Sequence, residues 1–146
     1  MAVHALGMLA CEGELCPGKG LTSEAIARSV NTNPVVVRRV LADLRRAGLV
    51  ETRRGVGGGV ALARPASRIT LRCVWEAIDE GEPQLFTRHP AGPNPKCRLG
   101  LVVADYLDDL YGHAEEVLKA SLGKVTLAQL RRDLSARLAA APDPVR

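Results

Sequence analysis

Aromatic residues are scarce in this chain of 146 residues, which has one Trp, one Phe and two Tyr. Its hydrophobic content is nonetheless 47%, which is enough for a packed core and excludes a wholly disordered chain. The core must therefore be built from Leu, Val, Ile and Ala, the residues that suit packed helices. The length predicts one domain of ordinary size, or one domain with an appendage.

Long hydrophobic runs and a leader-like N-terminus are also missing. No apolar stretch approaches the roughly 20 residues that a membrane span needs, and the longest, near 99–104, is interrupted by a glycine. No basic segment precedes the apolar residues at the N-terminus, so the pattern of a secretory signal peptide is absent. The four cysteines are too few and too scattered for a secreted disulfide scaffold. We therefore expect a cytoplasmic protein that makes no contact with a membrane.

The formal net charge of +4 is unevenly distributed along the sequence. Residues 1–72 contain eleven basic and five acidic residues, a net charge of +6. Residues 73–146 contain nine basic and eleven acidic residues, a net charge of −2. Such asymmetry is typical of a chain in which one half meets a polyanion, although arginine-rich helix surfaces also occur without nucleic acid. The sequence motifs have to decide between the two interpretations.

Two short helices are predicted near the N-terminus. Apolar residues recur at helical spacing over 2–11, and the following segment EGELCPGKG breaks that helix with three glycines and a proline. Thr22 can cap a second helix, SEAIARSV, whose Ile26 and Val30 share one side.

A third and longer helix is predicted directly after the short polar turn NTN. Asn33 can cap this helix, and Pro34 occupies its first position, where the missing N–H has no consequence. Gly48 ends the helix as a left-handed cap. The helical period places the buried stripe at Val37, Val40, Leu41 and Leu44.

A β-hairpin with a glycine-rich tip is predicted after the third helix. The strand-like segments LVETR and GVALA flank the tip, which carries Arg53, Arg54 and Gly55. Two guanidinium groups and bare backbone could approach phosphates or a minor groove there. A phosphate-cradling loop is the rival interpretation of the glycines. It fails because Val60 stands where a dinucleotide fingerprint needs Gly or Ala, and because a strand follows instead of a helix.

The second half of the chain is predicted to contain three helices and a loop. Thr70 can cap the helix LRCVWEAIDE, and residues 82–98, which include four prolines, are expected to form an irregular loop. Thr126 can cap the last helix, LAQLRRDLSARLAA. The apolar face of the first of these helices is expected at Leu71, Val74, Trp75 and Ile78.

A long helix with a nearly heptad-spaced apolar stripe is predicted over 99–122. Such a stripe can pack within the chain's own core, as most do, or against a second copy of the chain. The length of the helix, after a small and already complete domain, favours the second copy. The stripe consists of Leu99, Val103, Tyr106, Leu110 and Val117.

The order of elements, a short helix, a tight turn, a longer helix and a basic hairpin, is that of a winged helix-turn-helix. An α-helix fits the major groove of DNA, and its N-terminal residues reach the base edges. Arg can pair with guanine, Asn with adenine, and Val methyl groups can pack on a thymine methyl. Alternatively, the arginines of the longer helix merely form a solvated surface. The expected DNA-binding residues are Thr32, Asn33, Val36, Arg38, Arg39, Arg53, Arg54 and Gly55.

The run LTSEAIARSVNTNPVVVRRVLADLRRAGLVETRRGVGGGVALARP, followed by ITLRCVWEAI, resembles the Rrf2 type of bacterial winged-helix repressors. The resemblance covers residues 2 to about 130, and AGLVETRRGVGGG is its most specific part. It implies a homodimer that is held by the long C-terminal helix and binds a roughly palindromic operator. It also matches the wing-tip arginine to Arg54 and the groove-reading helix to Asn33, Val36, Arg38 and Arg39.

The resemblance raises the question of an iron–sulfur cluster. Cluster-binding members carry three cysteines in the loop before the dimerisation helix, whereas this loop contains only Cys97. One thiol and His89 cannot complete a four-ligand site, so we expect neither a cofactor nor a metal. An iron–sulfur or metal-sensing regulator of the same family remains the alternative.

Cys97 is the candidate sensor residue. It lies between Lys96 and Arg98 at the start of the long helix, and both the adjacent cations and a helix N-terminus favour a thiolate. Under the sensor hypothesis, oxidation of Cys97 would change the spacing of the two DNA-binding domains in a dimer. Alternatively, Cys97 is a small, inert packing residue. A small enzyme using Cys97 with His89 or His113 would need a conventional catalytic motif that the sequence does not offer, so we do not expect an enzyme.

These observations predict a mostly α-helical protein with a small β-hairpin wing. A winged helix-turn-helix domain is expected at 1–81, a proline-rich sensor-type loop at 82–98, the dimerisation and C-terminal helices at 99–141, and a tail at 142–146. The expected function is that of a sequence-specific transcriptional regulator, a homodimeric repressor whose partner is double-stranded operator DNA. A winged module that contacts only protein or RNA is the remaining alternative.

Overall fold

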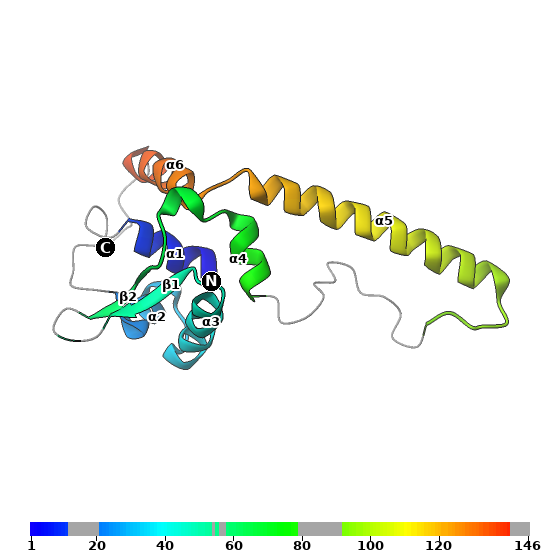
Figure 1. Ribbon diagram of the computed structural model, residues 1–146, viewed down its shortest axis with the longest axis horizontal. Helices are drawn as coiled ribbons and strands as arrows, with labels where there is room; N and C mark the ends of the chain where they lie inside the picture. The colour runs from blue at the N-terminus through cyan, green and yellow to red at the C-terminus, as the bar shows by residue number, and fades with distance from the viewer. Residues whose placement is uncertain (12–20, 54, 56–57, 79–91, 141–146) are drawn as a thin grey trace.

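The computed structural model describes residues 1–11, 21–53, 55, 58–78 and 92–140. These residues are mostly helical and contain one two-stranded antiparallel sheet, so the predicted fold class is confirmed (Figure 1). The elements are α1 (Ala2–Ala10), α2 (Ser23–Val30), α3 (Pro34–Arg46), β1 (Val50–Arg53), β2 (Gly59–Leu62), the 3-10 helix η1 (Ala66–Arg68), α4 (Leu71–Ile78), α5 (Arg98–Gly123) and α6 (Leu127–Ala140).

Helices α2 and α3 form the helix-turn-helix, and both begin at the predicted caps. The Thr22 hydroxyl accepts a hydrogen bond from the N–H of Ala25 at 3.2 Å, and the Asn33 side chain accepts one from the N–H of Val35 at 2.8 Å. Between the helices, Asn31 takes up a left-handed conformation with φ of 54°. Short polar residues tolerate this conformation, which lets the chain reverse within three residues.

The β-hairpin follows α3 as predicted. Gly48 has a φ of 66°, the left-handed conformation that ends a helix and that a Cβ would strain. Residues 50–53 of β1 pair with residues 59–62 of β2 in an antiparallel register. Val60 also donates its N–H to the carbonyl of Leu21 at 2.9 Å, so the segment before α2 is attached to the hairpin. This hydrogen bond connects the hairpin to the start of the helix-turn-helix.

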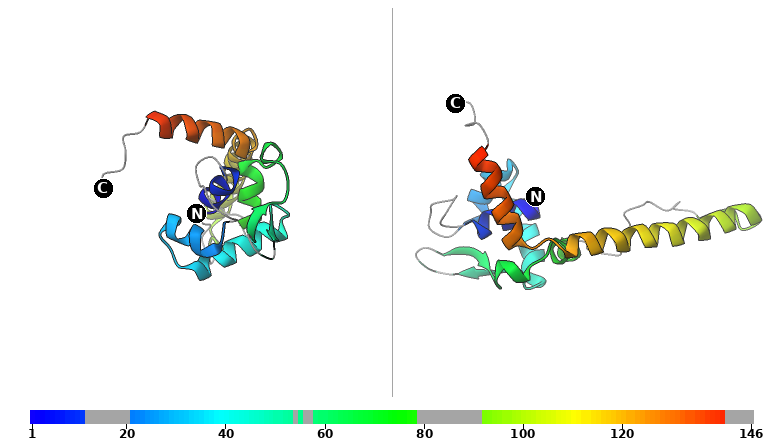
Figure 2. Two further views of the ribbon diagram at one scale, coloured as in Figure 1. Left: turned by 90° about the vertical axis from the view of Figure 1, so that its left-hand side faces the viewer. Right: turned by 90° about the horizontal axis from the view of Figure 1, so that it is seen from above.

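The hydrophobic core lies among α1, α2, α3, the hairpin, α4 and the start of α6. Its aliphatic composition follows from the scarcity of aromatic residues. The predicted stripe of α3 is buried at Val37, Leu41 and Leu44 and half-buried at Val40. Leu127 of α6 is fully buried in the same core, where its N–H donates to the carbonyl of Ile69 at 2.8 Å. The first turn of α6 is therefore an integral part of this core, and α6 lies against α1 (Figure 2).

Helix α4 begins at the predicted cap but buries less of its face than expected. The Thr70 hydroxyl accepts the N–H of Cys73 at 3.2 Å, and Val74 is buried. Ile78, which was expected on the same apolar face, is 38% exposed. The helical period indicates the side of a helix that faces the core but not how far along the helix the core extends. In the last turn of α4, Ala77 still packs against the core, whereas Ile78 does not.

Helix α5 extends as a rod away from the rest of the molecule (Figure 1). The structure describes all 26 of its residues, and none of them is buried. The interpretation of its apolar stripe as part of the chain's own core is therefore wrong within the described residues. None of the helices in these ranges is long and apolar enough to span a membrane. The stripe is exposed at Leu99 (72%), Val103 (46%), Tyr106 (67%), Leu110 (48%) and Val117 (54%).

Candidate nucleic-acid interface

The N-terminus of α3 presents apolar side chains to solvent. Val35 is 64% exposed and Val36 is 42% exposed, whereas Val37 is buried in the core. Asn33 holds them at the surface because its cap fixes the first turn, using one lone pair of its carbonyl oxygen for the N–H of Val35. Valine methyl groups at the tip of such a helix can contact a thymine methyl, while the amide N–H of Asn33 can donate to a base edge.

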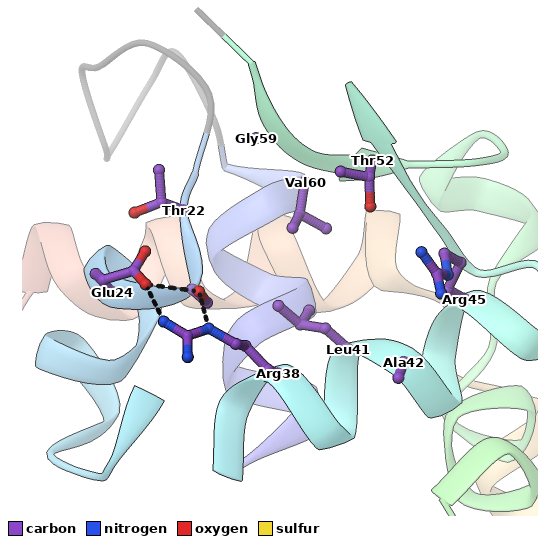
Figure 3. Close-up of a pocket in the computed structure, with 10 residues that line it drawn as sticks. Thr22, Glu24, Arg38, Leu41, Ala42, Arg45, Thr52, Gly59 and Val60 are labelled. Atoms are coloured by element: carbon purple, nitrogen blue, oxygen red, sulfur yellow. Dashed lines mark hydrogen bonds and ion pairs between the residues drawn. The ribbon is translucent and has the colours of Figure 1, made fainter. Parts of the chain in front are cut away.

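Arg38 projects from α3 toward the N-terminus of α2. Its Nη2 lies 2.6 Å from Oε1 of Glu24, and its Nε donates to the hydroxyl of Ser23 at 3.3 Å (Figure 3). The hydrogen bond from Arg38 lowers the pKa of Glu24 to about 2, with smaller contributions from the backbone N–H of Glu24 and from Ser23. The side chain of Arg38 is 59% exposed. It is therefore accessible to solvent and is also hydrogen-bonded to two residues of α2.

A hollow of about 350 Å³ lies between α2, α3 and the hairpin. Leu41 and Val60 lie in its middle, Arg38 and Glu24 lie at one end, and Arg45 lies at the other (Figure 3). Its polar lining includes hydroxyl and guanidinium groups, which can donate to DNA phosphates, together with the Glu24 carboxylate. Further lining residues are Thr22, Ser23, Ala42, Thr52 and Gly59.

Sequence reasoning missed Glu24 and Arg45 as members of this surface. Arg45 could have been found from the sequence, because it follows Arg38 by seven residues and so lies on the same face of α3. Glu24 could not have been found this way. Its proximity to Arg38 depends on the angle at which α2 packs on α3.

The other predicted DNA-binding residues are distributed between the turn, α3 and the hairpin. Thr32 is half-buried in the turn, and Arg39 is exposed on α3. Arg53 ends β1, and its Nε donates to Glu51 at 3.0 Å. Gly55 has a φ of 100°, a conformation that requires glycine at this point of the tip. Arg54, the predicted wing-tip arginine, lies outside the described residues.

Cys97 caps the N-terminus of α5, at the end of that helix farthest from the hairpin (Figure 1). Its side chain is exposed, and Sγ accepts the N–H of Gly100 at 3.3 Å. A Cβ at Gly100 would lie 3.4 Å from this sulfur and 3.5 Å from Cβ of Pro93, which are ordinary contact distances. The expectation that Cys97 lies at a helix N-terminus is confirmed, whereas its role as a sensor remains a prediction.

Comparison with known proteins identifies the family. The sequence pattern of the Rrf2 family, described as iron-dependent transcriptional regulators, matches residues 1–133. YwnA of Bacillus subtilis, named as an HTH-type transcriptional regulator, is 34% identical over 134 residues, which are 92% of this chain and 94% of YwnA. The structure of T. potens IscR matches with a TM-score of 0.66 at 22% identity, covering 98% of this chain and 88% of IscR. The structure of the cysteine regulator CymR of B. subtilis matches with a TM-score of 0.56 at 22% identity, covering 90% of each chain.

The iron named in the family description does not fit the residues in the described ranges. Among them, no three His, Cys, Asp or Glu side chains come together as a metal site. Cys11 is buried after α1, and Cys73 lies on α4, where hydrogen bonds from the hydroxyl and backbone of Thr70 lower the pKa of its thiol. Cys16 and His89 lie outside the described residues. By its sequence pattern, its relative YwnA and its fold, the chain belongs to the Rrf2 family of winged-helix transcriptional regulators, which bind DNA and are not enzymes.

Proposed function

We propose that the protein acts as a homodimeric repressor that binds a palindromic operator. The observation that carries this proposal is the uncovered apolar stripe of α5, in which Tyr106 is 67% exposed. Exposed apolar surface of this extent marks a protein contact, and near-heptad spacing suits a second helix of the same kind. A two-fold dimer relates its two α3 helices by symmetry, so its preferred operator has the same symmetry.

Within each protomer, we assign α3 to the major groove and the hairpin tip to the DNA backbone or minor groove. Asn33, Val36 and Arg39 are the proposed contacts of α3 besides Arg38, and Thr32 lies at the start of the same surface. The exposure of Val35 and Val36 supports this assignment. At the hairpin, the proposed contacts to phosphates or the minor groove are Arg53, Arg54 and Gly55.

Repression follows from the size of such a complex. A dimer with two heads in successive major grooves covers a segment of duplex, and an operator that overlaps a promoter would then be closed to RNA polymerase. We place this activity in the cytoplasm, where a bacterial regulator meets its DNA. The proposed division of the chain assigns DNA binding to residues 1–81, a sensor-type loop to 82–98, dimerisation and the C-terminal helix to 99–141, and a tail to 142–146.

We further propose that Cys97 makes the regulator responsive to thiol oxidation. Its exposure and its position as the cap of α5 support this proposal. Peroxide would be the oxidant: the thiolate sulfur attacks one oxygen, the O–O bond breaks, and hydroxide leaves with the electron pair. The product is a sulfenic acid in the cap of α5.

The proposal is tested by selection from a pool of random duplexes with the purified full chain. We expect the selected sequences to share a palindrome with two half-sites, and we expect sedimentation to show one dimer per duplex. Affinity should fall steeply with salt, as phosphate contacts require. A selected motif without internal symmetry would contradict the dimeric arrangement. Equal binding to selected and scrambled duplexes would contradict sequence-specific regulation and favour a module for protein or RNA contact.

A further inference from the structure

The guanidinium group of Arg38 is held along one of its two donor edges. Its side edge consists of Nε and Nη2, and both atoms are engaged by α2. Nε donates to the hydroxyl of Ser23 at 3.3 Å, and Nη2 donates to Oε1 of Glu24 at 2.6 Å. The Ser23 hydroxyl in turn donates to the same Oε1 at 3.1 Å. The three side chains thus form a closed hydrogen-bonded triangle, which restricts the rotation of the arginine.

The other edge of the same guanidinium group is available to a ligand. It consists of Nη1 and the second N–H of Nη2, and the side chain remains 59% exposed despite the contacts with α2. Two parallel N–H groups in one plane match the O6 and N7 acceptors of guanine. An arginine that is already oriented loses less conformational freedom when it forms such a pair.

We infer that Ser23 and Glu24 position Arg38 for recognition of a guanine, so that Glu24 determines base specificity through Arg38. The inference rests on the proposed function, because it requires α3 to enter the major groove. Glu24 acts here as a positioning residue, since it acts on the base only through the guanidinium group. Neither Ser23 nor Glu24 lies on the helix that reads the bases.

The charge of Glu24 gives this arrangement a second consequence. A carboxylate 2.6 Å from the guanidinium offsets its positive charge, so Arg38 attracts phosphates less than an unpaired arginine does. The low pKa of Glu24, about 2, keeps the carboxylate charged throughout the physiological range. Its location in the first turn of α2 also favours the negative charge. Arg38 therefore contributes mainly through its hydrogen bonds to a base, and other arginines supply most of the electrostatic attraction to phosphates.

The alternative is that Glu24 competes with DNA for Arg38. In that case Arg38 leaves Glu24 when DNA binds and contacts a phosphate, and removal of the carboxylate strengthens binding to every sequence alike. The two possibilities predict different base preferences for a chain without the Glu24 carboxylate, so an experiment can separate them.

The experiment uses duplexes selected by the wild-type chain, every single-base-pair variant of them, and a scrambled duplex. Arg38→Ala should lower the preference at one base pair about 5- to 150-fold, the range of a bidentate contact. Glu24→Gln should lower the preference at that same base pair at least about fivefold. It should also keep or strengthen binding to the scrambled duplex, and a steeper salt dependence, by a slope of about 0.9, would mark one new phosphate contact. Combining the two changes should cost no more preference than Arg38→Ala alone.

Glu51→Gln is the matched control. Glu51 also pairs with an arginine at 3.0 Å and has the same 49% side-chain exposure as Glu24, but it lies on the hairpin. Its change should leave the preference at the Arg38 base pair unaltered. Ser23→Ala should weaken that preference less than Glu24→Gln, and Glu24→Asp should restore part of it. Unchanged helical circular dichroism would show that each variant is folded.

Three outcomes would overturn the inference. The first is a Glu24→Gln variant with the wild-type base preference, and the second is a variant with equally strengthened binding to all duplexes. The third is a loss of preference that is spread evenly over the operator, because this indicates a disturbed helix instead of a misdirected arginine. Failure of the wild-type chain to select any sequence would refute the proposed function as well. That result is distinguishable because it does not depend on Glu24.

Discussion

At the scale of single residues, the ion pair between Glu24 and Arg38 makes stability depend on pH. The pKa of Glu24 is about 2 in the folded chain, against an ordinary value of 4.5. A carboxyl group whose pKa is lowered by folding stabilises the folded state when it is ionised. This contribution is present above the unfolded pKa and is lost as the pH falls through the folded pKa.

We therefore predict that wild type is more stable than Glu24→Gln at neutral pH and that the difference disappears in acid. The difference should be constant above about pH 5 and should shrink as the pH falls toward 2. It should also decrease in high salt, because both side chains are exposed. Urea midpoints of both chains measured across this pH range would check the prediction.

The Arg38→Ala background provides the control for this measurement. Without the guanidinium group, Glu24→Gln should produce a smaller difference, and its pH dependence should move toward that of an ordinary carboxyl group. A difference that is the same in both backgrounds would show that another group lowers the pKa of Glu24.

Residues that act on their own backbone neighbours could be predicted from the sequence, whereas residues that act across elements could not. Thr22, Asn33 and Thr126 cap helices as expected, because each bonds to an N–H two or three residues away. The pair of Glu24 and Arg38 spans 14 residues. Its formation depends on how α2 and α3 pack, which neither cap signals nor periodicity determine.

At the scale of elements, α5 differs from the other α-helices because none of its residues is buried and its apolar stripe is exposed in the described part of the chain. The spacing of its stripe predicted that the side chains would be covered. Spacing alone could not indicate whether the covering surface belongs to the same chain, because knobs pack into holes in the same way in both cases. The length of α5 favoured a second copy of the chain, and its 26 residues extend beyond the core.

We predict that Tyr106→Glu converts the protein to monomers. Tyr106 is 67% exposed in one chain and would be buried between two, where an unpaired carboxylate is strongly unfavourable. The dissociation constant of the dimer should rise at least about tenfold, which corresponds to about 1.4 kcal/mol. Sedimentation should show this change, and affinity for a palindromic duplex should fall with it.

Tyr106→Phe is the matched variant, because it keeps the ring and removes only the hydroxyl. It should remain a dimer. If Tyr106→Glu sediments like wild type, the stripe of α5 is not the interface, and the helix has a different partner.

At the scale of the whole molecule, the charge distribution follows the architecture. Residues 1–72, with a net charge of +6, include the helix-turn-helix and the hairpin, whereas residues 73–146, with a net charge of −2, include α5. A dimer would present two basic heads on a scaffold that does not itself attract DNA. The composition indicated such a division, but the projection of α5 away from the winged domain required the structure (Figure 1).

The same projection separates Cys97 from the DNA-binding surface by the length of α5. Twenty-six helical residues span about 39 Å, so Cys97 lies far from the DNA-binding surface of its own chain. Its oxidation can act through the dimer, because a change in the first turn of α5 alters how two such helices pack and thus the distance between the heads. Sγ accepts the N–H of Gly100, so an oxygen added to this sulfur would alter the cap of α5.

We therefore predict that mild peroxide lowers the affinity of wild type for its selected palindrome about tenfold or more and spares Cys97→Ser. Part of the lost affinity should return on palindromes with one base pair added or removed between the half-sites. Oxidation would change the distance between the two DNA-binding domains of the dimer but leave each domain intact. Mass spectrometry should find one oxygen or a disulfide at Cys97, and thiol reduction should restore binding. Equal loss in Cys97→Ser would assign the effect to Cys11, Cys16 or Cys73. Unchanged binding by wild type oxidised at Cys97 would refute the switch and leave this cysteine as a helix cap.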